Sequence, residues 1–430
     1  MTQRAEFTAE VDQNEFLPEG GRLVDAIVTV TARGTELRDA GGTPTAAQVI
    51  IVDTSGSMAA PASKIAEAKK ATAVAIDTLR DGVAFAVVAG DTTATLIYPA
   101  RPGMVPASDR TRAEAKREVA RLRASGGTAI GRWLWMAHHL FLRQQAEVKH
   151  AILLTDGRNE HESPEDFARV LAACEGSFVC DSRGVGENWS ATELRQVAST
   201  LLGTADGLDR PEDLPAAFRA MTEGAMGKAV ADVFLRVWTP AGATIRFLKQ
   251  VYPHVEDLTG RRVEVSARIG DYPTGAWGAE QRDYHISVEV EPDPVGEEVL
   301  AARVSLVSGG NLLIERLVLA RWTDDTALST RINKQVAHYT GQAELAAVIQ
   351  EGLAARDAGD VETATAKLGR AVKLATESGH TDTAKLLGKV VDVVDAPSGT
   401  VRLKKQVAGV DAELANVRSV KTIRVKKQQE

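Results

Sequence analysis

Hydrophobic and polar positions follow three different patterns along the chain. Between residues 48 and 203, short apolar runs alternate with stretches in which apolar positions recur every three or four residues. Residues 49–52 and 151–154 are uninterrupted apolar runs, which is typical of strands buried on both faces. Strands that alternate with helices indicate a mainly parallel sheet with helices on both sides. Further strands are predicted over residues 83–88, 94–98 and 177–180, a turn over 183–186, and helices over 61–79, 110–123 and 130–148.

A two-residue alternation replaces this pattern from residue 229 to about residue 320. Residues 284–291 place Ile286, Val288 and Val290 on one face of a strand and polar residues on the other. Residues 21–31 have the same texture but precede the α/β region. We therefore expect them to pair with the later strands, which makes the α/β region an insertion; a separate N-terminal hairpin is the alternative. Similar segments at 232–238, 243–248, 262–269, 299–307 and 312–320 predict a β-sandwich.

The C-terminal region turns helical after residue 324. Apolar positions at helical spacing over 353–377 and 384–391 predict a small helical bundle. The chain is therefore predicted to be α/β plus all-β plus α. A doubly wound, mainly parallel, Rossmann-like domain is inserted in a β-sandwich, and a helical bundle and a basic tail follow. The predicted divisions are 1–44 (strands that pair with the sandwich), 45–227 (α/β domain), 228–323 (sandwich), 324–395 (bundle) and 396–430 (tail).

Charge and hydropathy narrow the classes of partner. A formal net charge of -7 over 430 residues disfavours a general nucleic-acid binder, which needs a strongly basic face. No window approaches the roughly 18 uninterrupted apolar residues that span a bilayer. The first residues lack the basic and apolar pattern of a signal peptide, and the chain has two cysteines. We expect a cytoplasmic protein without membrane or nucleic-acid partners.

Oxygen-bearing side chains follow both of the buried strands. Asp53, Ser55 and Ser57 come after the first strand and Asp156 after the second, while Thr128 lies in a Gly-Gly-Thr loop before a predicted helix. Ligands bind at the carboxyl ends of strands in open α/β sheets. Hard divalent cations prefer oxygen ligands, and Mg²⁺ commonly takes one or two carboxylates. These five residues therefore predict a divalent-metal site.

The order of these motifs resembles a known family. Asp-x-Ser-x-Ser, then Gly-Gly-Thr, then Thr-Asp-Gly is similar to the metal-ion-dependent adhesion site of von Willebrand factor type A (VWA) domains of the bacterial type. The resemblance covers residues 45–204. It implies that Ser55, Ser57 and Thr128 coordinate Mg²⁺ or Mn²⁺, and that Asp53 and Asp156 bind the metal directly or through water. In this family one coordination position stays open, and an Asp or Glu of a partner protein often fills it.

The interpretation we favour is a non-enzymatic module that binds a partner carboxylate through the metal. Bacterial proteins with such domains often work beside kinases or phosphatases, so signalling is the expected context. Arg158, Asn159, Glu160 and His161 follow Asp156 and are candidates for partner contact; plain surface loop residues are the alternative. A metal-dependent hydrolase is a competing hypothesis, but no histidine has a clear place at the site to act as its base. A scaffold that the metal merely stiffens is the third.

A six-residue motif is repeated in the tail. Thr-Val-Arg-Leu-Lys-Lys begins at Thr400, and Thr-Ile-Arg-Val-Lys-Lys begins at Thr422. A chance duplication of a short basic strand explains this equally well as a functional motif. As a functional motif, Thr400 and Thr422 are candidate phosphorylation sites, whose partners would be a Ser/Thr kinase or a phosphothreonine reader.

Overall fold

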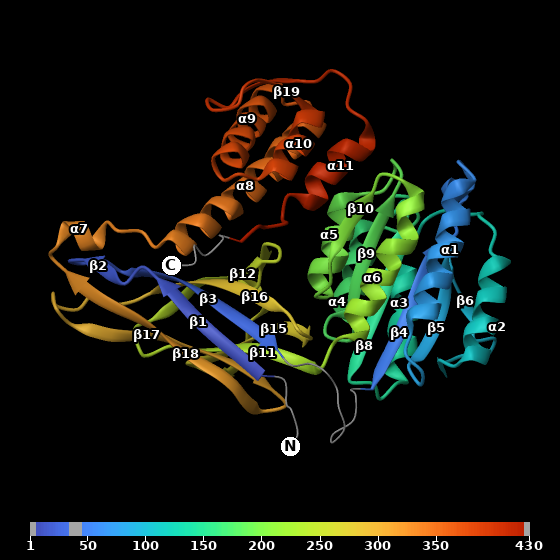
Figure 1. Ribbon diagram of the computed structural model, residues 1–430, viewed down its shortest axis with the longest axis horizontal. Helices are drawn as coiled ribbons and strands as arrows, with labels where there is room; N and C mark the ends of the chain where they lie inside the picture. Colours follow the sequence, from blue (N-terminus) through green and yellow to red (C-terminus); the bar gives the residue numbers. More distant parts are fainter. Residues whose placement is uncertain (1–5, 34–44, 425–430) are drawn as a thin grey trace. The chain divides into compact units, whose positions relative to one another are not determined.

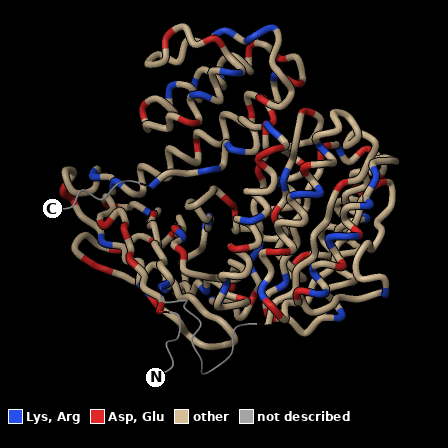
Figure 2. Tube along the Cα trace, turned by 45° about the vertical axis from the view of Figure 1, so that its right-hand side comes forward, with Lys and Arg blue, Asp and Glu red and all other residues tan. Residues whose placement is uncertain are grey.

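The computed structural model of the chain describes residues 6–33 and 45–424 (Figure 1). It consists of two compact units, each assembled from segments that are distant in sequence. The α/β unit contains residues 45–228 and 406–418, and the sandwich unit contains residues 6–33, 229–405 and 419–424. Lys and Arg alternate with Asp and Glu along both units in the view of Figure 2, in keeping with the mild net charge.

A mainly parallel sheet forms the centre of the α/β unit. Its strand order is β10-β9-β8-β4-β5-β6, and β7 also pairs with β5. β5 is antiparallel to β6 and β7, whereas the other neighbours are parallel. Every residue of β4 is buried, as its apolar run predicts. The strands are β4 (Ala46–Asp53), β5 (Ala84–Gly90), β6 (Ala94–Tyr98), β7 (Val105–Pro106), β8 (Val148–Thr155), β9 (Val179–Val185) and β10 (Ala205–Leu208).

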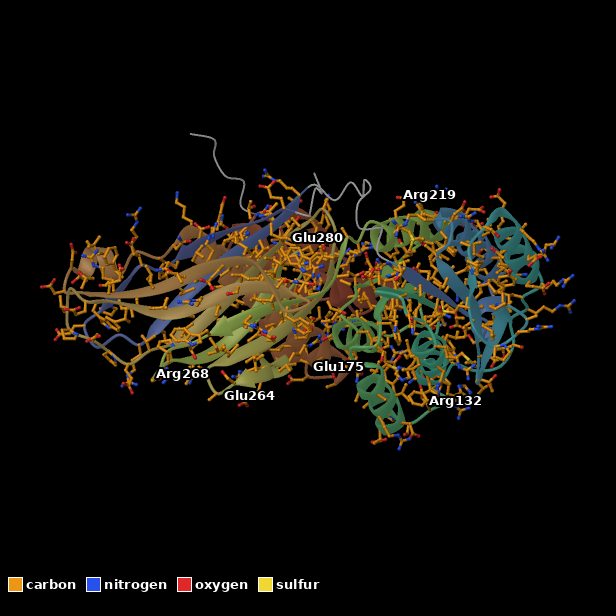
Figure 3. The ribbon with its side chains drawn as sticks, turned by 90° about the horizontal axis from the view of Figure 1, so that it is seen from below. Arg132, Glu175, Arg219, Glu264, Arg268 and Glu280 are labelled. Carbon is orange, nitrogen blue, oxygen red and sulfur yellow. The ribbon has the colours of Figure 1, made fainter. Side chains whose placement is uncertain are left out.

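Helices cover both faces of this sheet. α1 and α6 pack together on one face, and α3 and α4 pack together on the other. In Figure 3, Arg219 of α6 and Arg132 of α3 accordingly lie on opposite sides of the unit. The α/β part of the predicted fold is thereby confirmed. The helices are α1 (Ser63–Thr78), α2 (Asp109–Ala120), α3 (Ile130–Leu142), α4 (Pro164–Cys174), α5 (Ala191–Thr200), α6 (Leu214–Met226) and α11 (Gly409–Arg418), with a short 3₁₀ helix η1 (Gly56–Ala59).

Two sequence-based expectations in this unit are wrong. The helix predicted to reach residue 148 ends at Leu142, because the chain must turn before β8 begins. The turn predicted over residues 183–186 is largely strand, because β9 continues to Val185. Gly184 serves close packing there: a Cβ atom at this position would lie 2.1 Å from the ring of Trp189.

Two sheets form the sandwich unit. One has the order β1-β3-β16-β12-β13 and the other β14-β15-β11-β17-β18-β2. β3 pairs with β16, with Val24 opposite Val288, which confirms that the N-terminal strands join the later ones and that the α/β unit is an insertion. The strands are β1 (Glu6–Gln13), β2 (Phe16–Pro18), β3 (Leu23–Arg33), β11 (Val230–Trp238), β12 (Thr244–Tyr252), β13 (Glu256–Asp257), β14 (Val263–Ser266), β15 (Ile269–Trp277), β16 (Gln281–Glu289), β17 (Glu298–Ser308) and β18 (Asn311–Thr323).

The inner faces of the two sheets share one core. The largest side chains in it are aromatic, and the ring of Phe7 meets that of Trp277 edge-on at 5.8 Å between centroids. Such fully buried aromatic side chains each remove a large apolar area from water. The other aromatic residues of this core are Tyr272, Tyr284 and Trp322. The core of the sandwich therefore includes contacts between residues more than 200 positions apart.

A helical region follows β18. α8 packs against α9, and α9 packs against α10 and against the short hairpin of β19 and β20. The helical bundle predicted for this region is confirmed. None of the helices that the structure describes is long and apolar enough to cross a membrane. The elements are α7 (Thr326–Ser329), α8 (Lys334–Asp357), α9 (Val361–Glu377), α10 (Thr381–Val390), β19 (Val391–Asp395) and β20 (Thr400–Leu403).

The structure describes the predicted tail, residues 396–430, as far as Arg424, and the described part is folded. The first copy of the repeated motif, at Thr400, forms β20 and pairs with β19. The helix α11 then belongs to the α/β unit. In the second copy, the N–H of Thr422 donates to the carbonyl of Pro253, and Lys421 forms a β-bridge with His254. The two copies therefore have different surroundings, which a sequence repeat alone does not reveal.

Candidate metal centre

Asp53 joins the ends of two neighbouring strands. β4 and β8 are parallel, with Val52 opposite Leu154, so Asp53 and Thr155 end at the same edge of the sheet. One carboxylate oxygen of Asp53 accepts from the N–H of Ser55 at 2.7 Å. The other accepts from the hydroxyl of Thr155 at 2.6 Å and from the N–H of Asp156 at 3.3 Å. Because both of its oxygens accept hydrogen bonds, Asp53 holds the two loops together at this edge of the sheet.

Three oxygen-bearing side chains form a chain of hydrogen bonds beside Asp53. The hydroxyl oxygens of Ser55 and Ser57 lie 2.9 Å apart, and that of Ser57 donates to Oδ1 of Asp156 at 2.6 Å. Ser55 and Asp156 are buried, and Ser57 is half-buried. The structure thus brings together residues from the ends of β4 and β8, as the sequence motifs imply.

The loop at residues 125–128 is fastened to the first loop by backbone hydrogen bonds. The N–H of Ser125 donates to the carbonyl of Thr54, and the N–H of Gly56 donates to that of Gly126. Gly126 has a φ angle of +81°, a conformation that favours glycine. A side chain at Gly157 would press against Thr128, because its Cβ would lie 2.9 Å from the Thr128 hydroxyl. Thr128 is therefore held at the edge shared by the other four residues.

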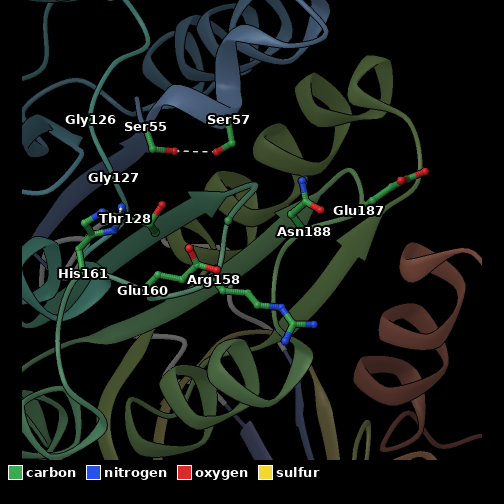
Figure 4. Close-up of a pocket in the computed structure, with 11 residues that line it drawn as sticks. Ser55, Ser57, Gly126, Gly127, Thr128, Arg158, Glu160, His161, Glu187 and Asn188 are labelled. Carbon is green, nitrogen blue, oxygen red and sulfur yellow. Dashed lines mark hydrogen bonds between the residues drawn. The ribbon is translucent and has the colours of Figure 1, made fainter. Parts of the chain in front are cut away.

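These loops open into a pocket of about 370 Å³. Figure 4 shows Ser55 and Ser57 on one side of it, with Thr128 and His161 across from them. Charged and polar side chains form the rim; besides His161 these are Arg158, Glu160, Glu187 and Asn188. Of the four residues after Gly157 that are candidates for partner contact, Arg158, Glu160 and His161 line the pocket. Asn159 instead accepts from the N–H of Ile130.

Burial dominates the electrostatics of Asp53. Removal from water raises the pKa of this carboxyl to about 6, and the neighbouring charge of Asp156 adds to the effect. Hydrogen bonds from Ser55 and Thr155 act in the opposite direction but do not offset the burial. The carboxylate of Asp156 is paired instead with the ammonium group of Lys64, at 2.6 Å.

The donor set suits a hard cation better than a soft one. Three hydroxyl groups line the pocket, and the buried carboxylates of Asp53 and Asp156 are hydrogen-bonded to the loop of Ser55 and Ser57. Nowhere among the described residues do three His, Cys, Asp or Glu side chains converge. Zinc sites normally need nitrogen or sulfur ligands, whereas Mg²⁺ accepts few carboxylates and completes its shell with neutral oxygens and water. The residues present therefore fit Mg²⁺ or Mn²⁺.

Two residues at the site have roles that were not expected from the sequence. Lys64 lies in the first turn of α1, where a cation opposes the helix dipole; that anomaly is the signal that it has a carboxylate partner elsewhere. His161 corrects the expectation that no histidine has a place at the site. Its Nδ1 accepts from the N–H of Thr128 at 3.2 Å, and its ring covers Gly127. Nothing in the local sequence pattern distinguishes it from a surface residue.

Comparison with known proteins identifies the family of this chain. Residues 47–206 match the sequence profile of the von Willebrand factor type A domain, and residues 373–419 that of the von Willebrand factor type A C-terminal domain. A solved structure, von Willebrand factor type A from Catenulispora acidiphila, is 52% identical, with a TM-score of 0.92 and 99% of each chain covered. The chain belongs to the von Willebrand factor type A family. VWA domains are generally protein-interaction modules, and they commonly bind a divalent metal.

More distant relatives extend the likeness of fold. The ArnB paralog VWA2 from Sulfolobus acidocaldarius shares 13% identity at a TM-score of 0.59, over 97% of this chain and 98% of that one. At this identity the likeness concerns the fold alone. An uncharacterised protein of Synechocystis sp. is 26% identical over 234 residues, which are 52% of this chain and 53% of that protein. The chain thus spans about half the length of this curated relative.

Proposed function

We propose that this VWA protein binds a partner protein through a divalent cation, Mg²⁺ or Mn²⁺. Ser55, Ser57 and Thr128 would coordinate the cation, and Asp53 and Asp156 would bind it directly or through water. The observation that supports this most strongly is that these five residues, from three separate loops, come together in the fold. Ser55, Ser57 and Thr128 line one open pocket, and the buried carboxylates of Asp53 and Asp156 accept hydrogen bonds from Ser55 and Ser57. Chance placement of motif residues does not produce such a convergence.

A bound divalent cation supplies strong positive charge to which a carboxylate can bond. The three hydroxyl ligands are neutral, so they leave most of the metal's charge available to an incoming ligand. A partner's Asp or Glu side chain entering the pocket is the group best suited to that position. The charged rim, which includes Arg158 and Glu160, would select among the sequences around that carboxylate.

Catalysis by the same site is disfavoured by the state of His161. In a neutral imidazole ring whose Nδ1 accepts from a backbone N–H, the proton lies on Nε2. That ring has no free lone pair with which to remove a proton from water, so it does not supply a general base. We therefore propose a non-enzymatic module that acts in the cytoplasm, in a signalling context. Turnover of a phosphoester that disappears in Thr128→Ala would replace this proposal with a metal-dependent hydrolase.

Direct binding experiments test the proposal. Mn²⁺ binding to the purified full chain is measured by calorimetry for the wild type and for Ser57→Ala combined with Thr128→Ala. These substitutions remove two proposed ligands but leave Asp53, which holds the ends of the two strands together. Ser63→Ala on α1 is the matched control. We expect the double variant to lose Mn²⁺ binding and the control to retain it. Equal affinity in all three proteins would rule out the proposed site.

A second experiment separates partner binding from a structural role. The tagged protein is used to capture partners from an extract with Mg²⁺, with chelator, and as the same double variant. We expect a partner whose capture needs both Mg²⁺ and the two hydroxyl ligands, and whose binding is then reproduced with the purified components. If chelation lowers the melting temperature but changes no partner, the metal serves only to stiffen a scaffold.

A further inference from the structure

Lys64 holds one oxygen of a carboxylate that the metal site shares. Its Nζ lies 2.6 Å from Oδ2 of Asp156, and its side chain is 8% exposed. The other oxygen of Asp156, Oδ1, accepts from the hydroxyl of Ser57. Lys64 therefore takes the side of the carboxylate that faces away from the hydroxyl ligands. It is placed to act on the charge of the site without occupying the ligand position itself.

The burial of this lysine needs an explanation. Other lysines on the same helix remain accessible: Lys70 is 65% exposed and pairs with Glu67 on the helix surface. Removing an ammonium group from water is costly, and the N-terminal end of a helix repels cations. The fold makes room for it even so, since a Cβ at Gly186 would lie 2.9 Å from Cε of Lys64. Lys64 neutralises Asp156, and its charge also changes the total charge of the site.

The charges of the buried groups can be summed for each state of the site. When both carboxyl groups are ionised, Asp53 and Asp156 together with Lys64 carry one net negative charge. A divalent cation changes this to one net positive charge, and a single carboxylate ligand then brings the site to neutrality. Without Lys64, the two aspartates alone would balance the metal, and an incoming carboxylate would leave a buried net negative charge, which is unfavourable.

We infer that Lys64 is a specificity-determining residue, whose fixed charge makes the metal-loaded site require an anionic ligand. The inference rests on the proposed function and adds a property to it. Lys64 must weaken metal binding by repulsion and strengthen carboxylate binding by attraction. A residue that only supports the fold would not shift these two affinities in opposite directions.

The test compares Lys64→Met with the wild type, both at pH 8. Mn²⁺ affinity is measured by electron paramagnetic resonance of the free ion. Acetate is then titrated onto the Mn²⁺-loaded protein, and its binding is followed by water-proton relaxation, because a carboxylate displaces coordinated water. Chloride at matched ionic strength controls for screening. Lys70→Met, on the exposed face of the same helix, is the matched control variant.

We expect Lys64→Met to bind Mn²⁺ about tenfold or more tightly and acetate about tenfold more weakly than the wild type. Lys64→Arg keeps the charge and should remain within about threefold of the wild type in both affinities. Both affinities unchanged in Lys64→Met, or both weakened together, would overturn the inference. If Lys64→Met does not fold, Lys64→Gln is used in its place. Failure of the wild type to bind Mn²⁺ would instead remove the proposed function itself.

Discussion

The carboxylate of Glu413 accepts a hydrogen bond from the backbone N–H of Ala191 at 2.7 Å, across 222 positions of sequence. Ala191 is the first residue of α5, so Glu413 satisfies a helix donor that has no partner within the helix. The other oxygen of Glu413 lies 3.2 Å from Nη2 of Arg158 on the pocket rim. One residue of α11 therefore connects two loops beside the metal site. The C-terminal part of the chain completes the VWA domain.

Glu413→Ala is expected to destabilise the α/β unit by about 1–2 kcal/mol, as the loss of other helix-capping side chains does. Chemical denaturation followed by circular dichroism measures the change. Glu223→Ala, at an exposed position on α6, is the control and should change the stability by less than about 0.5 kcal/mol. Equal stabilities of the two variants would show that α11 docks without the help of Glu413.

The pairing of His150 with Asp181 predicts how stability depends on pH. Burial alone would raise the pKa of Asp181, but the hydrogen bond and charge of His150, the charge of Arg183 and the hydroxyl of Thr204 together lower it. A carboxyl group whose folded pKa is depressed stabilises the fold above its unfolded pKa of about 4, and that contribution disappears as the pH falls. We expect the stability of the wild type to decline below about pH 4.

Asp181→Asn removes this ionisation. The variant should be less stable than the wild type at pH 7, and the difference should shrink as the pH falls from about 4 to 2. Urea denaturation of both proteins at several pH values measures the two curves. A constant difference over the whole acid range would contradict the assignment of this effect to Asp181.

Much of the fold was predictable because its signals are local. The fully buried run of β4 follows from burial on both faces of a sheet, and the two-residue alternation of β16 correctly predicted the apolar face that enters the core. The alternation did not predict that His285 and Ser287, on the other face of β16, are buried as well. The insertion could be inferred because β3 has the same alternation of apolar and polar residues as β16, the distant strand with which it pairs. The place of α11 could not, because a ten-residue helix carries no sequence signal for the surface on which it packs. Leu414 of α11 lies close to Gly207, a contact that exists only after β10 has formed.

Some residues of the metal site could likewise be predicted from local sequence signals, and others could not. Asp53, Ser55 and Ser57 are near one another in sequence, and the strand ends that precede Asp53 and Asp156 predict that these meet. Lys64 was not predicted as a site residue, and His161 was predicted only as a candidate for partner contact and not as a partner of the Thr128 loop. Both roles depend on the direction in which a side chain leaves a helix or loop. The one sequence signal for Lys64 is its positive charge in the first turn of α1, which is unfavourable beside the helix dipole and indicates a carboxylate partner elsewhere.

Tyr339→Phe is expected to destabilise the sandwich unit by about 1–3 kcal/mol. The hydroxyl of Tyr339 donates to the carboxylate of Asp283, which is 1% exposed, and Nε of Arg424 lies 3.3 Å from the same oxygen. When one donor is removed, the remaining hydrogen bonds no longer offset the free-energy cost of burying the carboxylate of Asp283. Thermal and urea denaturation measure the effect.

Tyr252→Phe is the control for that experiment. The ring of Tyr252 lies beneath the guanidinium group of Arg424 at 5.2 Å, and the substitution keeps this ring. We expect its stability to remain within about 0.5 kcal/mol of the wild type. If both variants are equally destabilised, the hydrogen bond to Asp283 is not the cause.

Phosphorylation of the repeated motif should distinguish its two threonines in the folded protein. Thr400 is exposed at the start of β20, and its hydroxyl lies 2.7 Å from that of Ser398. Thr422 is half-buried and its hydroxyl oxygen is inaccessible to solvent. Its N–H donates a hydrogen bond to the carbonyl of Pro253. A kinase must bind an extended segment with an accessible hydroxyl, so it can modify Thr422 only after the C-terminal segment detaches.

Incubation with a Ser/Thr kinase that prefers basic substrates, followed by phosphopeptide mass spectrometry, should therefore show modification at Thr400 well before Thr422. In urea-unfolded protein digested to peptides before labelling, the two sites should react at similar rates. Thr400→Ala is the control and should abolish the early phosphorylation signal. Equal labelling of both threonines in the native protein would contradict the prediction and would mean that the C-terminal segment detaches readily.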